Sequence, residues 1–303
     1  MTSISWTDET WNPTIGCSIV SPGCTNCYAM KMANRIQHLK PDPNSPYYGS
    51  TKVVNGKAVW TGKLAMASDA TLLKPLHWKK PRRIFVNSMS DLFHDDVPDE
   101  WIDKVFAVMA LCPLHTFQIL TKRSKRMREY MDEGFDNRSD KIGHQMRLIA
   151  DNKLQSGIID LPLPNVWLGV SCEDQTRADE RIPDLLATPA AVRFVSAEPL
   201  LGPIDFLMLH YDGTVNIDAL SGSHGLTVPL KGRGPKLDWI IAGSESGNCV
   251  RPAKEEWFRS IKDQAVSRGT AFFLKQYATA SGNKIHLPEL DGKTWQQYPE
   301  GSE

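Results

Sequence analysis

The sequence predicts an α/β protein: a parallel (β/α) barrel, complete or partial, with six to eight strands and loop insertions. Two observations predict it. Short runs of continuous apolar residues recur along the chain, and segments with helical spacing lie between them. Continuous apolar runs are typical of strands buried on both faces of a parallel sheet. Strands that alternate with helices form right-handed βαβ units.

The predicted strands are short apolar runs that each end in polar residues. Six of them are clear: 84–86, 117–120, 166–170, 192–195, 239–242 and 271–274. A seventh strand is expected before them, around residues 11–15. Continuous apolar or aromatic character, without alternation, favours burial on both faces over a half-exposed sheet.

Three segments carry the apolar spacing of amphipathic helices. In residues 29–36, apolar side chains occupy positions i, i+3, i+4 and i+7, namely Ala29, Met32, Ala33 and Ile36. Segment 99–111 begins at a potential N-cap, Asp99, and aligns its apolar residues on one stripe. Segment 253–268 repeats the pattern. These helices supply the crossovers that a parallel sheet requires.

Polar side chains follow nearly every predicted strand. In a barrel these loops share one face, where barrel enzymes place their sites. An open doubly wound sheet, the alternative, would concentrate function at one switch point. Polar residues after every strand favour the barrel. The segments concerned are 87–91, 121–123, 171–174, 196–198, 244–247 and 275–276.

The predicted domain organisation is one barrel over residues 1–278, followed by a C-terminal arm over 279–303. Two loop-like, Gly-rich stretches interrupt the barrel as insertions, at 38–70 and 205–236. The first insertion contains "VVNGKAVW", which predicts a hairpin turning at Asn-Gly.

Charge and hydropathy restrict the class of protein. The 35 basic and 35 acidic residues balance, so no net field drives binding to a polyanion. The sequence starts without a basic-then-apolar signal and holds no run of about 18 apolar residues, which predicts no membrane span. We therefore expect a cytoplasmic protein with reduced thiols. The sequence gives no oligomeric state.

Three of the six cysteines lie in one short stretch, "GCSIVSPGCTNCYAM", with the spacing Cys-x6-Cys-x2-Cys. They are Cys17, Cys24 and Cys27. Pro22-Gly23 predicts a turn, and a helix is expected to begin directly after Cys27. The positive end of that helix would stabilise thiolates or an anionic cluster held by them.

Four interpretations of this stretch stay open. A structural zinc site needs a fourth ligand, for which His94 is a candidate by sequence alone. A disulfide is disfavoured in the cytoplasm, and buried free thiols would not be expected in a Pro/Gly turn. An iron–sulfur cluster with three cysteine ligands leaves one iron open to a small molecule. The other cysteines are isolated: Cys112, Cys172 and Cys249.

A three-cysteine loop after the first strand of a (β/α) barrel resembles the radical S-adenosylmethionine superfamily. This chain differs from the common spacing, because six residues instead of three separate Cys17 from Cys24 and the aromatic Tyr28 follows the last cysteine. The resemblance implies a [4Fe-4S] cluster on the three cysteines and S-adenosyl-L-methionine as cofactor. It also implies a 5′-deoxyadenosyl radical and an electron donor of flavodoxin or ferredoxin type.

The chain as a whole is similar to a phage and bacterial family of three-cysteine-motif proteins of poorly known function. The similarity spans nearly the full length. The matching stretches are "TWNPTIGCSIVSPGCTNCYA", "FVNSMSDLFHDDVP", "FQILTKR", "WLGVSCEDQ", "RFVSAEPLLGPI", "WIIAGSESG" and "FFLKQ".

The superfamily resemblance also implies cofactor contacts. Ser88, Ser90 and Asp91 follow the second strand, where radical enzymes of this superfamily hold the methionine amino group. Their alternative role is that of an ordinary strand-to-helix cap. Ser171 and Glu173 follow a later strand and would bond ribose hydroxyls or the carboxylate.

Charged residues at other strand ends are candidate catalytic groups. Glu198 would bind substrate, move a proton, or pair with Lys122 or Arg123. Glu245 lies between glycines that let a ligand approach the backbone. A buried ion pair is the alternative for each carboxylate. Cys172 is either a hydrogen donor to a radical or a small buried side chain.

Two basic runs, 74–83 and 122–128, raise the possibility of a nucleic-acid substrate. Basic residues with an interleaved aromatic suit a phosphate backbone and a stacked base, but a solvated helix face explains either run singly. The leading hypothesis is a radical S-adenosylmethionine enzyme for modification or repair of nucleic acid or a nucleotide. The alternatives are a zinc-containing nucleic-acid-binding protein and a non-catalytic partner subunit.

Overall fold

The computed structural model of the chain divides into two compact units. The first unit comprises Met1–Trp167 and Pro189–Ala191, and the second comprises Leu168–Thr188 and Val192–Glu303. The second unit includes Cys249, which lies outside the described residues. The structure describes residues 4–39, 41–132, 135–151, 159–211, 215–225, 234–246, 250–278 and 284–300.

The main sheet has eight strands, and four of its recorded pairings are parallel: β1–β6, β6–β7, β9–β13 and β13–β14. The last strand pairs antiparallel with its neighbour. A mixed α/β fold with a mostly parallel sheet is therefore confirmed, whereas closure into a complete barrel is not. The order is β1 (Glu9–Trp11), β6 (Arg83–Val86), β7 (Thr116–Thr121), β8 (Val166–Ser171), β9 (Val192–Ala197), β13 (Trp239–Gly243), β14 (Ala271–Ala278) and β15 (Lys284–His286).

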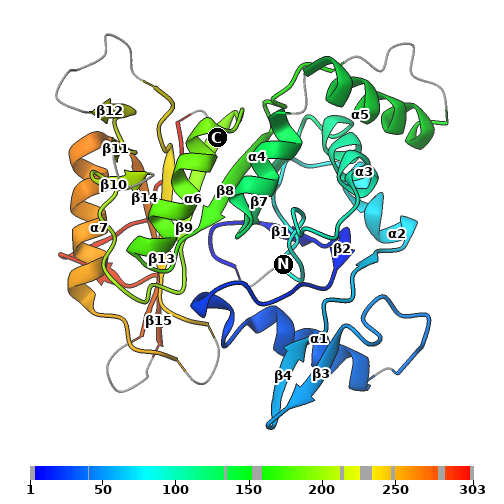
Figure 1. Cartoon of the computed structure of the whole chain (residues 1–303), viewed down its shortest axis with the longest axis horizontal. Coiled ribbons are helices and arrows are strands. Elements are labelled where there is room, and N and C mark those ends of the chain that lie inside the picture. The colour runs from blue at the N-terminus through cyan, green and yellow to red at the C-terminus, as the bar shows by residue number, and fades with distance from the viewer. Residues whose placement is uncertain are drawn as a thin grey trace. The chain divides into compact units, whose positions relative to one another are not determined.

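Helices of the first unit pack apolar stripes inward. On α3 (Asp99–Ala110), four residues of the predicted stripe are buried, Ile102, Val105, Phe106 and Met109, and the fifth, Trp101, is half-buried. Helix α5 lies beside α3 (Figure 1). The bounds of the other helices in this unit are α1 Tyr28–Leu39, α2 Asp69–Leu72, α4 Ser124–Asp132 and α5 Phe135–Ile149, with 3₁₀ turns at Pro22–Cys24 and Lys74–His77.

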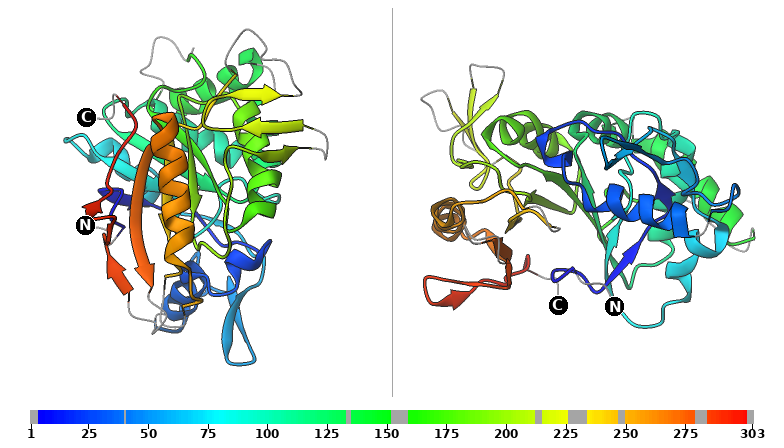
Figure 2. Two further views of the ribbon diagram at one scale, coloured as in Figure 1. Left: turned by 90° about the vertical axis from the view of Figure 1, so that its left-hand side faces the viewer. Right: turned by 90° about the horizontal axis from the view of Figure 1, so that it is seen from below.

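In the second unit, helices α6 (Gln175–Ala187) and α7 (Glu255–Arg268) accompany the strands, and α7 runs along β14 (Figure 2). Asp174 caps α6 by accepting a hydrogen bond from the Arg177 N–H. The ring of Trp239 on β13 contacts Phe194 on β9 and Phe273 on β14. Side chains of one parity on these strands therefore share a face.

The expected seventh strand at residues 11–15 is divided in two. Strand β1 joins the main sheet and ends at Trp11, while β2 (Thr14–Ile15) pairs antiparallel with β5 (Ala65–Met66). Pro13 lies between them, and a proline cannot donate a ladder hydrogen bond. The prediction of one continuous strand was wrong for this reason.

Short hairpins occupy much of the predicted insertions. Strands β3 (Thr51–Val54) and β4 (Lys57–Trp60) form the hairpin predicted from Asn-Gly, with positive φ at Asn55 and Gly56. A three-stranded sheet lies within 205–236, and two short strands follow β15. Their bounds are β10 Leu209–Tyr211, β11 Val215–Asp218, β12 Ser223–Gly225, β16 Glu289–Leu290 and β17 Lys293–Thr294. Within the described ranges, no helix combines the length and the apolar character needed to span a membrane.

Candidate functional site

The three clustered cysteines lie on a loop between β2 and α1 in the first unit. All three side chains are half-buried and unbonded to one another. Pro22–Cys24 forms a 3₁₀ turn, which agrees with the turn predicted at Pro22-Gly23. Helix α1 begins at Tyr28, directly after Cys27, so its free N–H groups face the loop. We call residues 16–27 the thiol loop.

The segment after β6 holds the start of the thiol loop in place. The Asn87 side chain accepts from the Thr14 N–H and donates to the Thr14 hydroxyl. Ser88 Oγ donates to Asn12 Oδ1 at 3.1 Å, and Ser90 Oγ donates to the Thr14 carbonyl at 2.8 Å. Ser88 and Ser90, which the sequence suggested as cofactor contacts, therefore position the segment that leads into Cys17.

The carboxylate of Asp91 is saturated by donors of the chain itself. Oδ1 accepts from the Phe93 N–H and the Thr121 hydroxyl, at 3.1 and 2.7 Å. Oδ2 accepts from the Lys122 N–H and from Arg123 Nη1, at 3.1 and 2.9 Å. With four donors on two oxygens, Asp91 joins the loops after β6 and β7 and has little capacity left for an ammonium ligand.

The guanidinium of Arg123 is buried against the thiol loop. Besides Asp91, it contacts Cys17 Sγ at 3.8 Å through Nη1 and donates to Ser18 Oγ at 2.7 Å through Nη2. Its Nε pairs with the exposed Asp95 at 3.3 Å. The sequence indicated Arg123 as one charge in a basic run and as a possible partner of Glu198, because nothing in the run marks which residue turns inward.

His94 is buried in the same network, and both of its ring nitrogens are in use. Nδ1 accepts from the Asp96 N–H at 3.1 Å, and Nε2 lies 2.8 Å from Ser18 Oγ. Burial, followed by the charge of Arg123, lowers the pKa of His94, so the ring is neutral near pH 7. His94 therefore does not present a free nitrogen as a fourth zinc ligand.

Burial dominates the protonation of two of the thiols. It raises the pKa of Cys17 to about 12, with Asp91 acting in the same direction and Arg123 against it. Burial also raises the pKa of Cys27, and the backbone N–H groups of Met30 and Ala29 oppose that rise. Without a metal ion, both thiols are protonated near neutral pH.

The donor set of the thiol loop fits a soft metal or an iron–sulfur cluster in chemical type. The thiols influence one another electrostatically, Cys17 with Cys27 and Cys27 with Cys24. Arg123 and Lys122 add positive charge beside them, which would offset the charge of ligating thiolates. As arranged in the described residues, however, no group of three or more His, Cys, Asp or Glu side chains could hold a metal ion. The fit therefore rests on donor chemistry.

Two further candidates lie next to the thiol loop. Tyr28, the first residue of α1, is 54% exposed and so is reachable from solvent. Lys122 donates its N–H to Asp91, and its charge lowers the pKa of Cys27. Lys122 is therefore an electrostatic neighbour of Cys27.

In the second unit, the predicted ribose contacts belong to an internal ion pair. Glu173 is fully buried and lies 3.2 Å from Arg181, which also donates to the Ser171 carbonyl at 2.7 Å. A carboxylate with no exposed surface cannot reach a ligand from solvent. Cys172, between them, is fully buried as well. The structure therefore favours the ion-pair alternative for Glu173 and the packing role for Cys172.

The two remaining carboxylates of the second unit are also paired. Glu245 is buried and binds Arg251 through both oxygens, at 2.5 and 3.2 Å. Glu198 pairs at 2.9 Å with Lys275, a partner that the sequence did not suggest, and it accepts from the Ser196 hydroxyl at 3.2 Å. Unlike Glu245, Glu198 and its partner both remain partly exposed.

The two basic runs differ in how their charges are used. In 122–128, Arg123 is buried, Arg126 pairs with Asp99, and Lys125 approaches Glu129 at 3.9 Å. In 74–83, the lysines are exposed, but Lys74 and Arg82 lie over the ring of Trp78 at 5.3 and 5.4 Å. The indole thus already contacts two cations of the chain itself.

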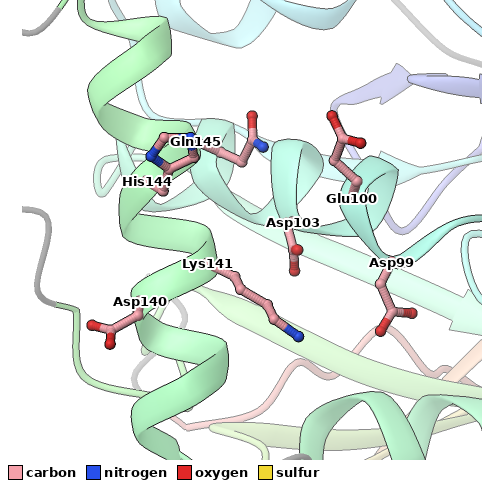
Figure 3. Close-up of a pocket in the computed structure, with 7 residues that line it drawn as sticks. All are labelled: Asp99, Glu100, Asp103, Asp140, Lys141, His144 and Gln145. Carbon is pink, nitrogen blue, oxygen red and sulfur yellow. The ribbon is translucent and has the colours of Figure 1, made fainter.

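A pocket between α3 and α5 is separate from the thiol loop. It is lined by Asp99, Glu100, Asp103, Asp140, Lys141, His144 and Gln145 (Figure 3). Asp99 and Asp103 are occupied by Arg138, at 2.9 and 2.8 Å. Internal ion pairing accounts for the two most buried acids of this pocket.

Comparison with protein families places the chain. Residues 1–299 match the family described as "Protein of unknown function (DUF5131)", and the chain belongs to that family. No curated protein and no solved structure matches it.

Proposed function

We propose that this member of the DUF5131 family binds an iron–sulfur cluster through Cys17, Cys24 and Cys27 and acts as a radical S-adenosylmethionine enzyme. The observation that carries the proposal is the positive environment of the thiol loop. Arg123 contacts Cys17, while Lys122 and the N–H groups at the start of α1 act on Cys27. Cations and N–H donors beside sulfur are the surroundings that an anionic cluster requires.

When bound, such a cluster supplies the electron that cleaves S-adenosyl-L-methionine and yields a 5′-deoxyadenosyl radical. The residues of the chain do the rest. Asp91 and Ser18 hold Arg123 against Cys17, and the segment after β6 fixes the approach to the thiol loop. Tyr28 is exposed beside the last cysteine, where it can border a bound cofactor. A partial (β/α) barrel and an electron donor of flavodoxin or ferredoxin type belong to the same proposal.

The proposed substrate is a nucleic acid, with a nucleotide as the smaller alternative. Exposed lysines of the first basic run precede β6, whereas the thiol loop lies at the other end of the first strands. A four-residue strand spans about 13 Å. A polymer can contact both places at once more readily than a mononucleotide can, so a polymer is favoured.

The test is anaerobic reconstitution of the full chain with iron and sulfide, followed by counting of iron, sulfide and zinc. About four iron atoms per chain are expected, with loss of iron in the Cys17, Cys24 and Cys27→Ala triple variant and no loss in Cys112→Ala, a buried thiol outside the loop. Reduction in the presence of S-adenosyl-L-methionine should release 5′-deoxyadenosine.

Each other result selects a different function. One zinc and no iron would select the zinc-containing nucleic-acid-binding protein. A cluster without cofactor cleavage would indicate a non-catalytic partner subunit. Wild-type protein that retains neither metal would end the proposal.

A further inference from the structure

One ion pair of the second unit is open to solvent at the carboxyl ends of β9 and β13, beside the neighbouring strand β14. Lys275 Nζ lies 2.9 Å from Glu198 Oε1, and the two side chains retain 17% and 13% of their exposure. The Glu173–Arg181 pair of the same unit retains 0% and 2%. A ligand from solvent can therefore reach Lys275, at the end of parallel strands where α/β proteins bind ligands.

The pairing of β14 with β13 is irregular at Lys275. Ala242 pairs with Leu274, but Gly243 pairs with Gln276, so Lys275 is the extra residue of a β-bulge. Bulges are over-represented next to functional sites, where they redirect a side chain. Here the bulge directs Lys275 toward Glu198, which follows the end of β9.

Gly243 makes room for the pair. A Cβ atom on this residue would lie 2.6 Å from Glu198 Oε1 and 3.1 Å from its Cδ. The carboxylate thus lies directly against the glycine backbone, and any larger residue would displace it. The end of β13, which lies between β9 and β14, therefore leaves space for this ion pair.

Hydrogen-bond accounting shows which partner has capacity left. Glu198 uses both oxygens, one for Lys275 and one for Ser196. The ammonium of Lys275 carries three donors, and in the described part of the chain Glu198 is the acceptor recorded for it. The unsatisfied group of the site is therefore a donor with positive charge.

We propose that Lys275 binds an anionic oxygen of a small ligand, from a phosphate or a carboxylate group, while Glu198 and Ser196 hold the ammonium in place. This site goes beyond the proposed cluster chemistry and requires no metal. Because it is tested on metal-free protein, its failure and the failure of the thiol-loop proposal are separate results.

The experiment is calorimetric titration of the metal-free full chain with inorganic phosphate and, separately, with acetate, which distinguishes the two sources of the anionic oxygen. Lys275→Met should weaken binding by at least about tenfold, since it removes the positive charge that is proposed to attract the ligand. Glu198→Gln should tighten binding by roughly fivefold, because it keeps an acceptor and removes a repelling charge. Lys254→Met, at an exposed pair with Glu256, is the matched control and should bind as wild type.

A purely structural ion pair gives a different pattern. The proposal is overturned if wild type binds neither probe, if Lys275→Met binds as wild type, or if Glu198→Gln weakens binding. Should Lys275→Met fail to fold, the Lys275→Met/Glu198→Gln double variant removes both charges together. That variant must then bind less tightly than Glu198→Gln alone.

Discussion

The thiol loop of the first unit and the strand ends of the second unit use buried charge in opposite ways. In the first unit, the carboxylate of Asp91 is saturated, and the arginine that it holds reaches onward to a sulfur. In the second unit, Glu173 and Glu245 each bind an arginine of the same unit. The comparison teaches that ion pairing alone does not identify a site, and that Arg123 indicates one because it also contacts the Cys17 thiol.

Breaking the most buried pair should produce the largest effect. Glu173→Ala leaves Arg181 charged and unpaired in the interior, and we expect the free energy of unfolding to fall by about 3–5 kcal/mol. Urea unfolding of the full chain measures it. Glu180→Ala, which removes the exposed partner of Arg177, is the control and should cost under about 1 kcal/mol. Equal losses in both variants would contradict the distinction between structural and surface pairs.

The thiol loop is tested by the reactivity of Cys17. Because burial raises its pKa to about 12, thiolate is scarce at pH 8. In metal-free protein we expect iodoacetamide to modify Cys17 roughly 50-fold more slowly than a thiol in an unstructured peptide. The modification rate, measured by peptide mass spectrometry, should rise about tenfold per pH unit up to pH 10. If the modification rate reached a plateau near pH 9, Cys17 would have the pKa of an ordinary exposed thiol. Burial would then not control its protonation.

The open pair is tested through the glycine beneath it. Gly243→Ala places a Cβ against Glu198, and we expect a loss of about 1–3 kcal/mol in the free energy of unfolding. The second comparison is with Gly269→Ala, where no atom lies near the added Cβ but φ is +67°. A Gly243→Ala variant as stable as wild type would mean that Glu198 is not fixed against the strand.

The smallest effect is expected on the outer face of the second basic run. Lys125 lies 3.9 Å from Glu129 on α4, and both side chains are exposed. Lys125→Ala should change the free energy of unfolding by no more than about 0.5 kcal/mol. A decrease of several kcal/mol in the free energy of unfolding, measured by heat or urea, would show that exposed residues of this run also stabilise the fold.

The sequence predicted the fold well where a strand is buried on both faces. The apolar runs at 84–86, 117–120 and 239–242 all lie within strands of the main sheet. It did not predict α5, whose sequence is largely polar. Helix α6 was equally unexpected, since it contains Pro183. Tertiary contacts, more than local pattern, determine such elements.

For the site, the sequence indicated the loops but not the partners within them. Lys275 was noted only as a polar residue after a strand, and its pairing with Glu198 joins positions 77 apart in the chain. Arg123 could not be separated from the neighbouring basic residues by composition. Which charged group turns inward depends on the bulge, the turn and the neighbouring strand, and none of these is local in sequence.

The hydrogen bonds that support the thiol loop have a consequence for the order in which the protein is synthesised and folds. Asn12 and Thr14 are hydrogen-bonded to residues 76 positions later, Ser88 and Ser90. During synthesis the three cysteines therefore emerge well before the segment that supports them, and the loop acquires its bracing only once β6 is in place. If the thiol loop binds a metal, as proposed, the braced arrangement of its cysteines becomes available to that metal only after β6 has folded.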